Sequence, residues 1–504
     1  MSRFRSAWDS LVAWPHLPRL LEALLLLLVL AEFVRVVARL ISLDQSLQWD
    51  EAVYAVRART WVDPDVPLSG WSYIRPPLLP LVATVPVLAG GDEAQLRAVG
   101  LAIGVALVLC AWWLARSIAG PLAGLVAAAV VATGPAVQRW SATLLTDLPA
   151  AALLIAVAIM LWRELELRPR PGAGLVIAAG LAGLAFGMRY GSIVALAPML
   201  VLAAVLWWRR LAAAPRVTAA AVGLGIVIAL GHLAWSMLQT GLPLGILFAA
   251  QNVVSVDPAG DVPIDEYLRY VDFALAGDAG QVALVAGVAA LPIALIASMF
   301  WTRWSRPARA MAFLVPSALI HVALLTSGVA HAEERFFVFS TTLLIVCGVS
   351  ATVLIVRPLP WPAVGAMLVV AAYGIVIARA PAVDYAFDWT LRTGAYYERF
   401  RTAGEAMREI AVDDCGIITG ADPIVAWYSG CATDRLRLPA PGGSVADVLD
   451  ADERWLVLYG GYADIDFDAS PTREAIGEVS GPPLRITDPV TGDVIAWAWR
   501  FADR

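Results

Sequence analysis

Long apolar runs recur through the first three quarters of this 504-residue chain, and they constrain its fold more than any other feature. Each run is 16 to 22 residues long, close to the roughly 20 apolar residues that an α-helix needs to cross a bilayer. The chain is 60% hydrophobic and 15% charged, whereas soluble globular proteins average about 45–50% apolar and about 25% charged residues. The sequence therefore predicts an α-helical polytopic membrane protein with eleven spans. The predicted spans lie near residues 20–41, 95–115, 119–136, 144–162, 173–188, 191–208, 217–236, 281–301, 310–328, 336–356 and 361–379.

The arginines in the loops between these spans predict the orientation of the chain. If the N-terminus is inside, the inside segments hold fourteen arginines. The short outside loops after the first then hold only four, Arg139, Arg189, Arg269 and Arg335. Basic residues favour the cytoplasmic side. We therefore expect a multi-pass protein of the plasma (inner) membrane with a cytoplasmic N-terminus, and the odd span number places residues 380–504 outside.

The last quarter of the chain differs in composition from the rest. Residues 380–504 hold 11 arginines and 21 acidic residues, whereas residues 1–379 hold 25 arginines and 21 acidic residues. The pattern of the tail predicts a helix over 386–411, helical turns near 422–429 and 444–451, and strands at CGIITG, DRLRLP, RWLVLYGG and VIAWAWRF. We therefore predict a transmembrane domain over 1–379 and a small soluble extracytoplasmic α/β domain over 380–504. This domain could recognise an acceptor, pack on the catalytic face or bind a partner.

Two of the four cysteines, Cys415 and Cys431, lie in this tail. An outside compartment allows them to form a disulfide, which would stabilise the domain by about 3 kcal/mol in the chain-entropy description. Two free thiols are the alternative.

The first outer loop, residues 42–94, carries the most informative polar residues. Asp50 and Glu51 open a stretch with helical spacing, and a proline-broken apolar run follows, so we expect two elements that lie in the interface or re-enter it. The acidic pair is a candidate general base or metal-binding pair, and helix capping is the competing interpretation. Arg75, beside a rigid Pro-Pro corner, is a candidate for bidentate phosphate binding, with snorkelling at the membrane surface as the alternative.

Three further charged clusters lie at the outer ends of spans, whereas the span interiors are nearly free of charge. Taken singly, each cluster is an ordinary set of loop charges. Under the predicted topology all three reach the same face as Asp50, which indicates an acid-and-arginine site for a phosphate-bearing substrate. The clusters are Thr146–Asp147 before the fourth span, Arg189–Tyr190 between the fifth and sixth, and His331, Glu333, Glu334 and Arg335 before the tenth.

The order of these motifs resembles a known family. The segments WDEAVYA, YIRPPLLPL, AQLRAVGLAIG, TLLTDLPA, GLAFGMRYGS and EERFFVFS follow one another within residues 20–340. In this order they resemble the GT-C-type polytopic membrane glycosyltransferases, in particular the branch with protein O-mannosyltransferases and the lipid A aminoarabinose transferase. The resemblance implies transfer of a sugar from a polyprenyl-phosphate-linked donor to an acceptor at the outer membrane face, with inversion.

The resemblance also implies roles for individual residues. Asp50 would be the base that takes the proton of the acceptor hydroxyl, with Glu51 and Asp147 as further catalytic acids. Arg75, Arg335 and Arg189 would lie near the donor phosphate. Further candidate substrate contacts are Tyr54, Tyr73, His331 and Glu334.

The expected partners are the polyprenyl-phosphate sugar, membrane lipid and a glycan, lipid or protein acceptor, but no nucleic acid. No cofactor is expected to be required, although Asp50, Glu51 and Asp147 could hold a divalent metal. The rival interpretation is a non-enzymatic carrier or flippase for a lipid-linked saccharide with an outer sensor domain, for which we would expect polar groups within the spans or a repeated half-structure. An envelope-binding protein anchored by many spans is a third class, and it would not need the Asp-Glu and Arg-Pro-Pro loop.

Overall fold

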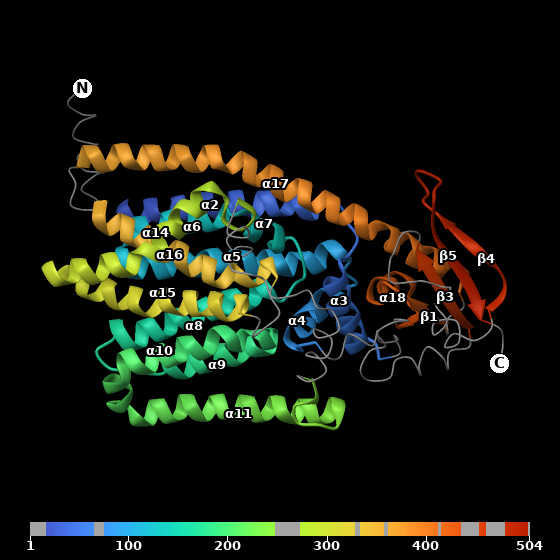
Figure 1. Ribbon diagram of the computed structural model, residues 1–504, viewed down its shortest axis with the longest axis horizontal. Coiled ribbons are helices and arrows are strands. Elements are labelled where there is room, and N and C mark those ends of the chain that lie inside the picture. Colours follow the sequence, from blue (N-terminus) through green and yellow to red (C-terminus); the bar gives the residue numbers. More distant parts are fainter. Residues whose placement is uncertain are drawn as a thin grey trace.

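The computed structural model consists of a long helical bundle and a small C-terminal sheet beside one end of it (Figure 1). It describes residues 17–64, 75–246, 273–327, 333–356, 361–411, 415–434, 453–459 and 479–501. The predicted fold class, an α-helical polytopic membrane protein with a small C-terminal α/β part, is confirmed.

The bundle contains the helices that run along its long axis (Figure 1). They are α2 (Leu17–Ile41), α5 (Glu93–Ala119), α6 (Pro121–Ala132), α8 (Asp147–Trp162), α9 (Gly174–Met188), α10 (Ile193–Ala212), α11 (Pro215–Thr240), α14 (Phe273–Phe300), α15 (Ser305–Thr326), α16 (Val338–Val356) and α17 (Trp361–Ile410). Short helical segments join them: α7 (Pro135–Ser141), η1 (Arg163–Leu167), η2 (Tyr190–Ser192), η3 (Thr302–Trp304) and η4 (Glu334–Phe337).

The predicted number of eleven spans is not confirmed. Each of the eleven predicted ranges lies mostly on a helix. Within the described residues, however, seven helices are long and apolar enough to cross a membrane, or eight if α6 and α7, which are bent by 66°, form one broken span. Three predicted ranges are not among these helices: the first lies on α2, which carries five charged residues, the fifth on α9, which has only 15 residues, and the eleventh on the first part of the 50-residue helix α17. The predicted boundary at residue 380 therefore falls inside a continuous helix.

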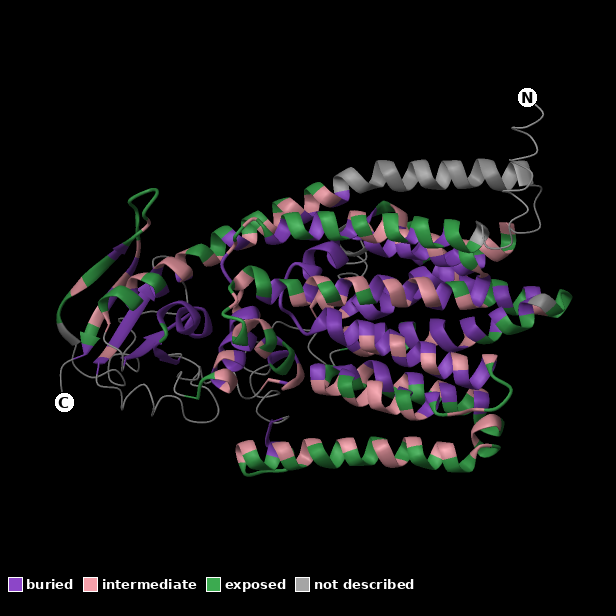
Figure 2. Cartoon of the chain, turned by 180° about the vertical axis from the view of Figure 1, so that it is seen from behind, coloured by how far each residue is buried: buried purple, intermediate pink, exposed green. Residues whose placement is uncertain are grey.

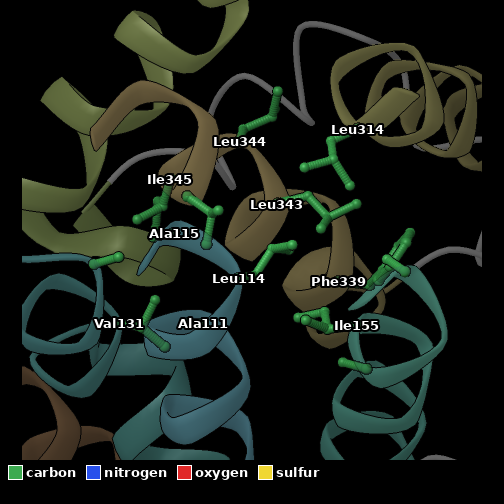
Figure 3. Packing of buried hydrophobic residues seen from close by; sticks show 14 of the residues in the cluster. Ala111, Leu114, Ala115, Val131, Ile155, Leu314, Phe339, Leu343, Leu344 and Ile345 are labelled. Atoms are coloured by element: carbon green, nitrogen blue, oxygen red, sulfur yellow. The ribbon is translucent and has the colours of Figure 1, made fainter. Parts of the chain in front are cut away.

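The core of the bundle surrounds α8 and α16. In each of these two helices 78% of the residues in its apolar 18-residue stretch are buried, whereas none are in α11 at the edge of the bundle (Figure 2). Side chains of α5, α6, α8 and α15 meet those of α16 in the interior (Figure 3). Small residues allow this close packing: a Cβ atom on Gly287 of α14 or Gly348 of α16 would overlap the backbone of the opposite helix.

Two short helices of the first outer loop lie between the bundle and the sheet (Figure 1). They are α3 (Trp49–Val62) and α4 (Leu78–Leu88), which contact each other. The sequence predicts an interfacial helix with Arg57 and Arg59 on a polar face. In the structure α3 is buried almost all round, Arg57 included, because the C-terminal part covers the face turned away from the bundle.

The C-terminal sheet has five strands in the order β2-β1-β3-β5-β4. The strands are β1 (Cys415–Thr419), β2 (Ala432–Asp434), β3 (Glu453–Tyr459), β4 (Val479–Thr487) and β5 (Val494–Phe501), and helix α18 (Asp422–Ser429) connects the first two. Strand β1 is parallel to β2 and β3, whereas β5 is antiparallel to β3 and β4. The edge strand β4 was not predicted, because it contains a Gly-Pro-Pro sequence that is unusual in strands. The predicted helical turn near 444–451 lies outside the described residues.

Helix α18 attaches the sheet to the membrane body. The backbone N–H of Leu47, just before α3, donates to the Tyr428 hydroxyl at 3.0 Å, and the Trp427 indole donates to Glu93 at 2.9 Å. A disulfide joins Cys415 and Cys431, as predicted, and thereby ties the start of β1 to the end of α18.

Candidate active site

The adjacent acids Asp50 and Glu51 point to different places. The Glu51 side chain is fully buried and accepts hydrogen bonds from the backbone N–H groups of Gln48 (3.0 Å) and Leu144 (2.9 Å). The Arg97 guanidinium donates to both of its oxygens, each at 3.1 Å. Glu51 therefore caps α3 and ties it to α5 and to the segment before α8. Its carboxylate is already surrounded by protein donors.

Arg97, which lies in the AQLRAVGLAIG segment but was not predicted as a site residue, reinforces the same junction. Besides Glu51 it donates to the backbone carbonyls of Gln45 (2.7 Å) and Ser46 (2.9 Å), directly before α3. Arg97 lies in the first turns of α5, and its guanidinium is a buried cation next to the start of α3.

Asp50 points toward arginines from distant parts of the chain. Its Oδ1 accepts from Arg75 at 2.9 Å and its Oδ2 from Arg335 at 2.6 Å. Burial of Asp50 opposes ionisation, but the attraction of the Arg75, Arg335 and Arg189 guanidiniums outweighs it and lowers the pKa of Asp50 to about 2. Asp50 is therefore a carboxylate with charged donors on both oxygens.

Asp147, the first residue of α8, completes the cluster. It forms an ion pair with Arg189, and its Oδ2 lies 3.3 Å from Arg335 Nε. Arg335 therefore bridges Asp50 and Asp147, and it also contacts Glu333 at 2.9 Å. The Arg189 guanidinium stacks on the Phe336 ring, 3.3 Å from its centre. We name Asp50, Asp147, Arg75, Arg189 and Arg335 the acid–arginine cluster.

The remaining predicted site residues lie at the edges of this cluster or outside the description. The Tyr54 hydroxyl lies 3.3 Å from that of Thr146, and burial raises the pKa of Tyr54. Glu334 lies 3.8 Å from Arg139. Tyr73 and His331 lie outside the described residues.

A cavity of about 340 Å³ opens beside Asp50. Residues from the start of α3, from α7 and the segment after it, from η4 and from α17 line it. The lining residues are Gln48, Trp49, Asp50, Arg139, Trp140, Leu145, Glu333, Glu334, Arg335, Trp389, Thr393 and Tyr397. Sequence reasoning selected Asp50, Glu334 and Arg335 but missed Arg139 and the three residues of α17. The three α17 residues are spaced four apart, which places 389, 393 and 397 on one helix face, and this spacing is the signal that could have found them.

The cluster is stabilised by guanidinium groups. No group of three or more His, Cys, Asp or Glu side chains in the described part of the chain is placed to hold a metal ion. The positive charge near Asp50 and Asp147 comes from arginines of the loop before α4, the α9–α10 turn and η4. Such an arrangement can bind an anion and accept a proton within a few ångströms.

Comparisons with known proteins find a family model that matches part of the chain. Residues 75–235 match the family described as dolichyl-phosphate-mannose-protein mannosyltransferase. This segment contains Arg75, Asp147 and Arg189 of the acid–arginine cluster. No curated protein matches the chain in sequence.

Solved structures with a similar fold include ArnT from Cupriavidus metallidurans. The apo ArnT structure superposes with a TM-score of 0.58 at 14% identity, over 94% of this chain and 97% of that chain. The structure of ArnT bound to undecaprenyl phosphate has a TM-score of 0.55 at 15% identity and covers 94% of this chain and 98% of that chain. The apo structure of the oligosaccharyltransferase of Archaeoglobus fulgidus has a TM-score of 0.52 at 14% identity and covers 95% of this chain and 74% of that chain. These findings confirm the predicted resemblance: the chain has the GT-C-type fold of polytopic membrane glycosyltransferases.

Proposed function

We propose that the protein is a glycosyltransferase that moves a sugar from a polyprenyl-phosphate donor to an acceptor at the outer membrane face. The observation that carries this proposal is the acid–arginine cluster: a carboxylate, Asp50, between two arginines and open to a cavity. The family match names a dolichyl-phosphate sugar, and one structure of similar fold holds undecaprenyl phosphate, which supports a lipid phosphate as the leaving group.

The reaction needs a base and a place for negative charge. The oxygen of the acceptor hydroxyl attacks the anomeric carbon, the bond from that carbon to the phosphate oxygen breaks, and polyprenyl phosphate leaves with the bonding electrons. Asp50 takes the acceptor proton, and the displacement inverts the anomeric centre. Arg75, Arg335 and Arg189 stabilise the charge that develops on the phosphate.

The ion pairs of Asp50 imply a specific role for the donor. A carboxylate with a pKa of about 2 is a poor proton acceptor, because two guanidiniums satisfy its charge. A donor phosphate offers Arg75 and Arg335 an alternative anion with more acceptor oxygens. Phosphate binding then loosens both ion pairs and makes Asp50 a stronger base when a sugar is in place.

Asp147 and Glu51 serve the site indirectly in this proposal. Asp147 orients Arg189 and Arg335, and Glu51 fixes the start of α3, so that Asp50 is the base. The arginines supply the charge that a divalent metal supplies elsewhere, and we propose that no metal is required. The protein would be in the plasma (inner) membrane with its cluster and sheet outside, and its acceptor would be a glycan, lipid or protein.

A transfer assay tests the proposal. Purified full-length protein is incubated with membrane extract and radiolabelled polyprenyl-phosphate sugars, and the labelled product is identified. We expect transfer by the wild type and loss of at least about 10²-fold in Asp50→Asn, since the base is removed without a change of size. Asp44→Asn in the same loop, whose side chain is 76% exposed, is the matched control and should retain activity. Sugar-lipid binding without transfer by the wild type would instead favour the carrier.

A further inference from the structure

The cavity beside Asp50 has a second group of polar atoms that the proposed reaction leaves unused. Arg139 of α7 and Glu334 of η4 line it, 3.8 Å apart, with side chains only 9% and 22% exposed. Arg139 Nε and Glu334 Oε1 are buried, and neither has a hydrogen-bond partner among the described residues. An unsatisfied donor beside an unsatisfied acceptor costs free energy that a ligand offering both can recover.

The charges of the cavity argue against an ionic ligand. Of the three acids in its wall, Asp50 and Glu333 contact Arg335, and Glu334 faces Arg139. In the proposed function Arg335 binds the donor phosphate, and the other arginine of the wall, Arg139, already faces Glu334, so a second anion would meet mainly carboxylates. A cation would find each carboxylate already beside a guanidinium. A neutral ligand rich in hydroxyl groups avoids both problems, because a hydroxyl donates and accepts at once.

The shape and the aromatic lining narrow the ligand further. The volume of about 340 Å³ is at the small end of ligand pockets. Trp49, Trp140, Trp389 and Tyr397 provide flat apolar walls around the polar atoms. The C–H face of a pyranose or furanose ring packs on such walls while its edge presents neighbouring hydroxyls.

One wall of this cavity comes from α17, the helix that leads into the sheet. Trp389, Thr393 and Tyr397 face the cavity, and the Arg139 guanidinium stacks on the Trp389 ring. Trp389 therefore holds Arg139 in position, and its own position depends on α17. All three residues lie outside the segment 75–235 that matches the family.

We propose that this cavity is a subsite for one neutral sugar ring, in which Arg139 and Glu334 bind neighbouring hydroxyl groups and α17 sets the sugar specificity through Trp389. The inference rests on the proposed function, because Asp50 at the edge of the cavity is the base of that reaction. The ring belongs either to the donor or to the acceptor.

The experiment measures lipid affinity and acceptor dependence on the full-length protein in nanodiscs. The variants are Glu334→Gln, which keeps the size of the side chain, and Trp389→Leu, which releases Arg139. Arg392→Gln, on the outer face of the same helix with a 78% exposed side chain, is the control. The lipids are undecaprenyl phosphate alone and the same lipid carrying mannose or glucose.

If the ring belongs to the donor, both variants should raise the Kd of a sugar-bearing lipid by about tenfold and leave that of undecaprenyl phosphate unchanged. If it belongs to the acceptor, all lipid affinities stay unchanged and the half-saturating acceptor concentration rises by a similar factor. The control should change neither quantity. Equal loss of affinity for bare and sugar-bearing lipids, or no change in any of these quantities, overturns the proposal.

Failure of the proposed function gives a different result. The protein could transfer no sugar while its affinity for a sugar-bearing lipid still depends on Glu334 and Trp389. That result would support the sugar subsite and contradict the proposed glycosyltransferase activity. Midpoints of thermal unfolding for all variants separate loss of the subsite from loss of the fold.

Discussion

At the scale of residues, Asp50 and Glu51 show how two adjacent acids acquire different roles. One helical step rotates the side chain by about 100°, so that Asp50 points toward Arg75 and Arg335 while Glu51 points into the junction with α5. Capping and catalysis were competing interpretations of the pair in the sequence. The structure gives the cap to Glu51 and leaves Asp50 beside the cavity.

Removing the charge of Glu51 should affect folding more than chemistry. Glu51→Gln leaves Arg97 as a buried cation without its carboxylate, and breaking such a pair costs about 3–5 kcal/mol. We expect a large fall in the midpoint of thermal unfolding. Asp50→Asn should have a much smaller effect, because Arg335 keeps Asp147 and Glu333. Equal midpoints for Glu51→Gln and the wild type would contradict this assignment.

The ionisation of Asp50 predicts a pH dependence. Because its pKa of about 2 lies below the ordinary 3.8, its ion pairs stabilise the protein fully above pH 4, and this stability is lost as the pH falls toward 2. In Arg75→Gln the pKa of Asp50 should rise, so kcat/KM should fall between pH 6 and pH 4 in the variant but not in the wild type. The shape of the pH profile, not its height, is the measurement. Identical profiles would show that Arg75 does not control this carboxylate.

Metal removal gives a further test at this scale. The carboxylates of Asp50 and Asp147 are paired with guanidiniums, so EDTA should leave sugar transfer unchanged within about twofold. Loss of transfer in EDTA, restored by Mg²⁺ or Mn²⁺, would show that a metal enters the cluster.

At the scale of elements, the contact between α3 and α18 connects the sheet to the site. Tyr428 of α18 binds the backbone three residues before Asp50, and the Arg59 guanidinium of α3 donates to the Trp427 carbonyl at 2.9 Å. Local sequence predicted both helices, but not their contact, because no local pattern encodes a pairing across nearly 400 residues. Packing on the catalytic face was one of three roles open to the C-terminal part, and in the structure α18 packs on α3, the helix that carries Asp50.

The disulfide should therefore support the active site as well as the sheet. Reduction frees the end of α18, and we expect a loss of about 3 kcal/mol in stability together with a lower kcat at unchanged donor affinity. The unfolded protein should titrate two thiols without reductant and four with it, since Cys110 and Cys347 are free. Unchanged kcat in the reduced, folded protein would show that the disulfide serves only the sheet.

At the scale of the whole molecule, helix α3, which carries Asp50 of the acid–arginine cluster, and the sheet lie at the same end of the bundle (Figure 1). Helix α8 starts at Asp147 in the cluster and leads to the opposite end, where Glu166 pairs with Arg309 at 2.6 Å. The distribution of arginines predicts that this opposite end is cytoplasmic.

Labelling of single cysteines tests that orientation. Val490→Cys, at a position 92% exposed in the β4–β5 turn, should react with a membrane-impermeant maleimide in intact cells. Arg170→Cys, at the exposed turn after η1, should react only after permeabilisation. The native cysteines give little background, because two form the disulfide and the two free ones, Cys110 and Cys347, lie within the apolar helices α5 and α16. The reverse pattern would invert the proposed topology.

The sequence by itself determined the helical membrane body, the acidic tail with most of its described strands, and the charged residues that form the acid–arginine cluster. These features depend on apolar run length, charge and local periodicity, which are properties of one continuous stretch of chain no longer than a span. Only the tertiary structure decided which of the two acids faces the cavity, that Arg189 pairs with Asp147, and that α17 lines the cavity with Trp389. These outcomes depend on which distant helices pack together, because close packing selects one arrangement among many that satisfy the same local patterns.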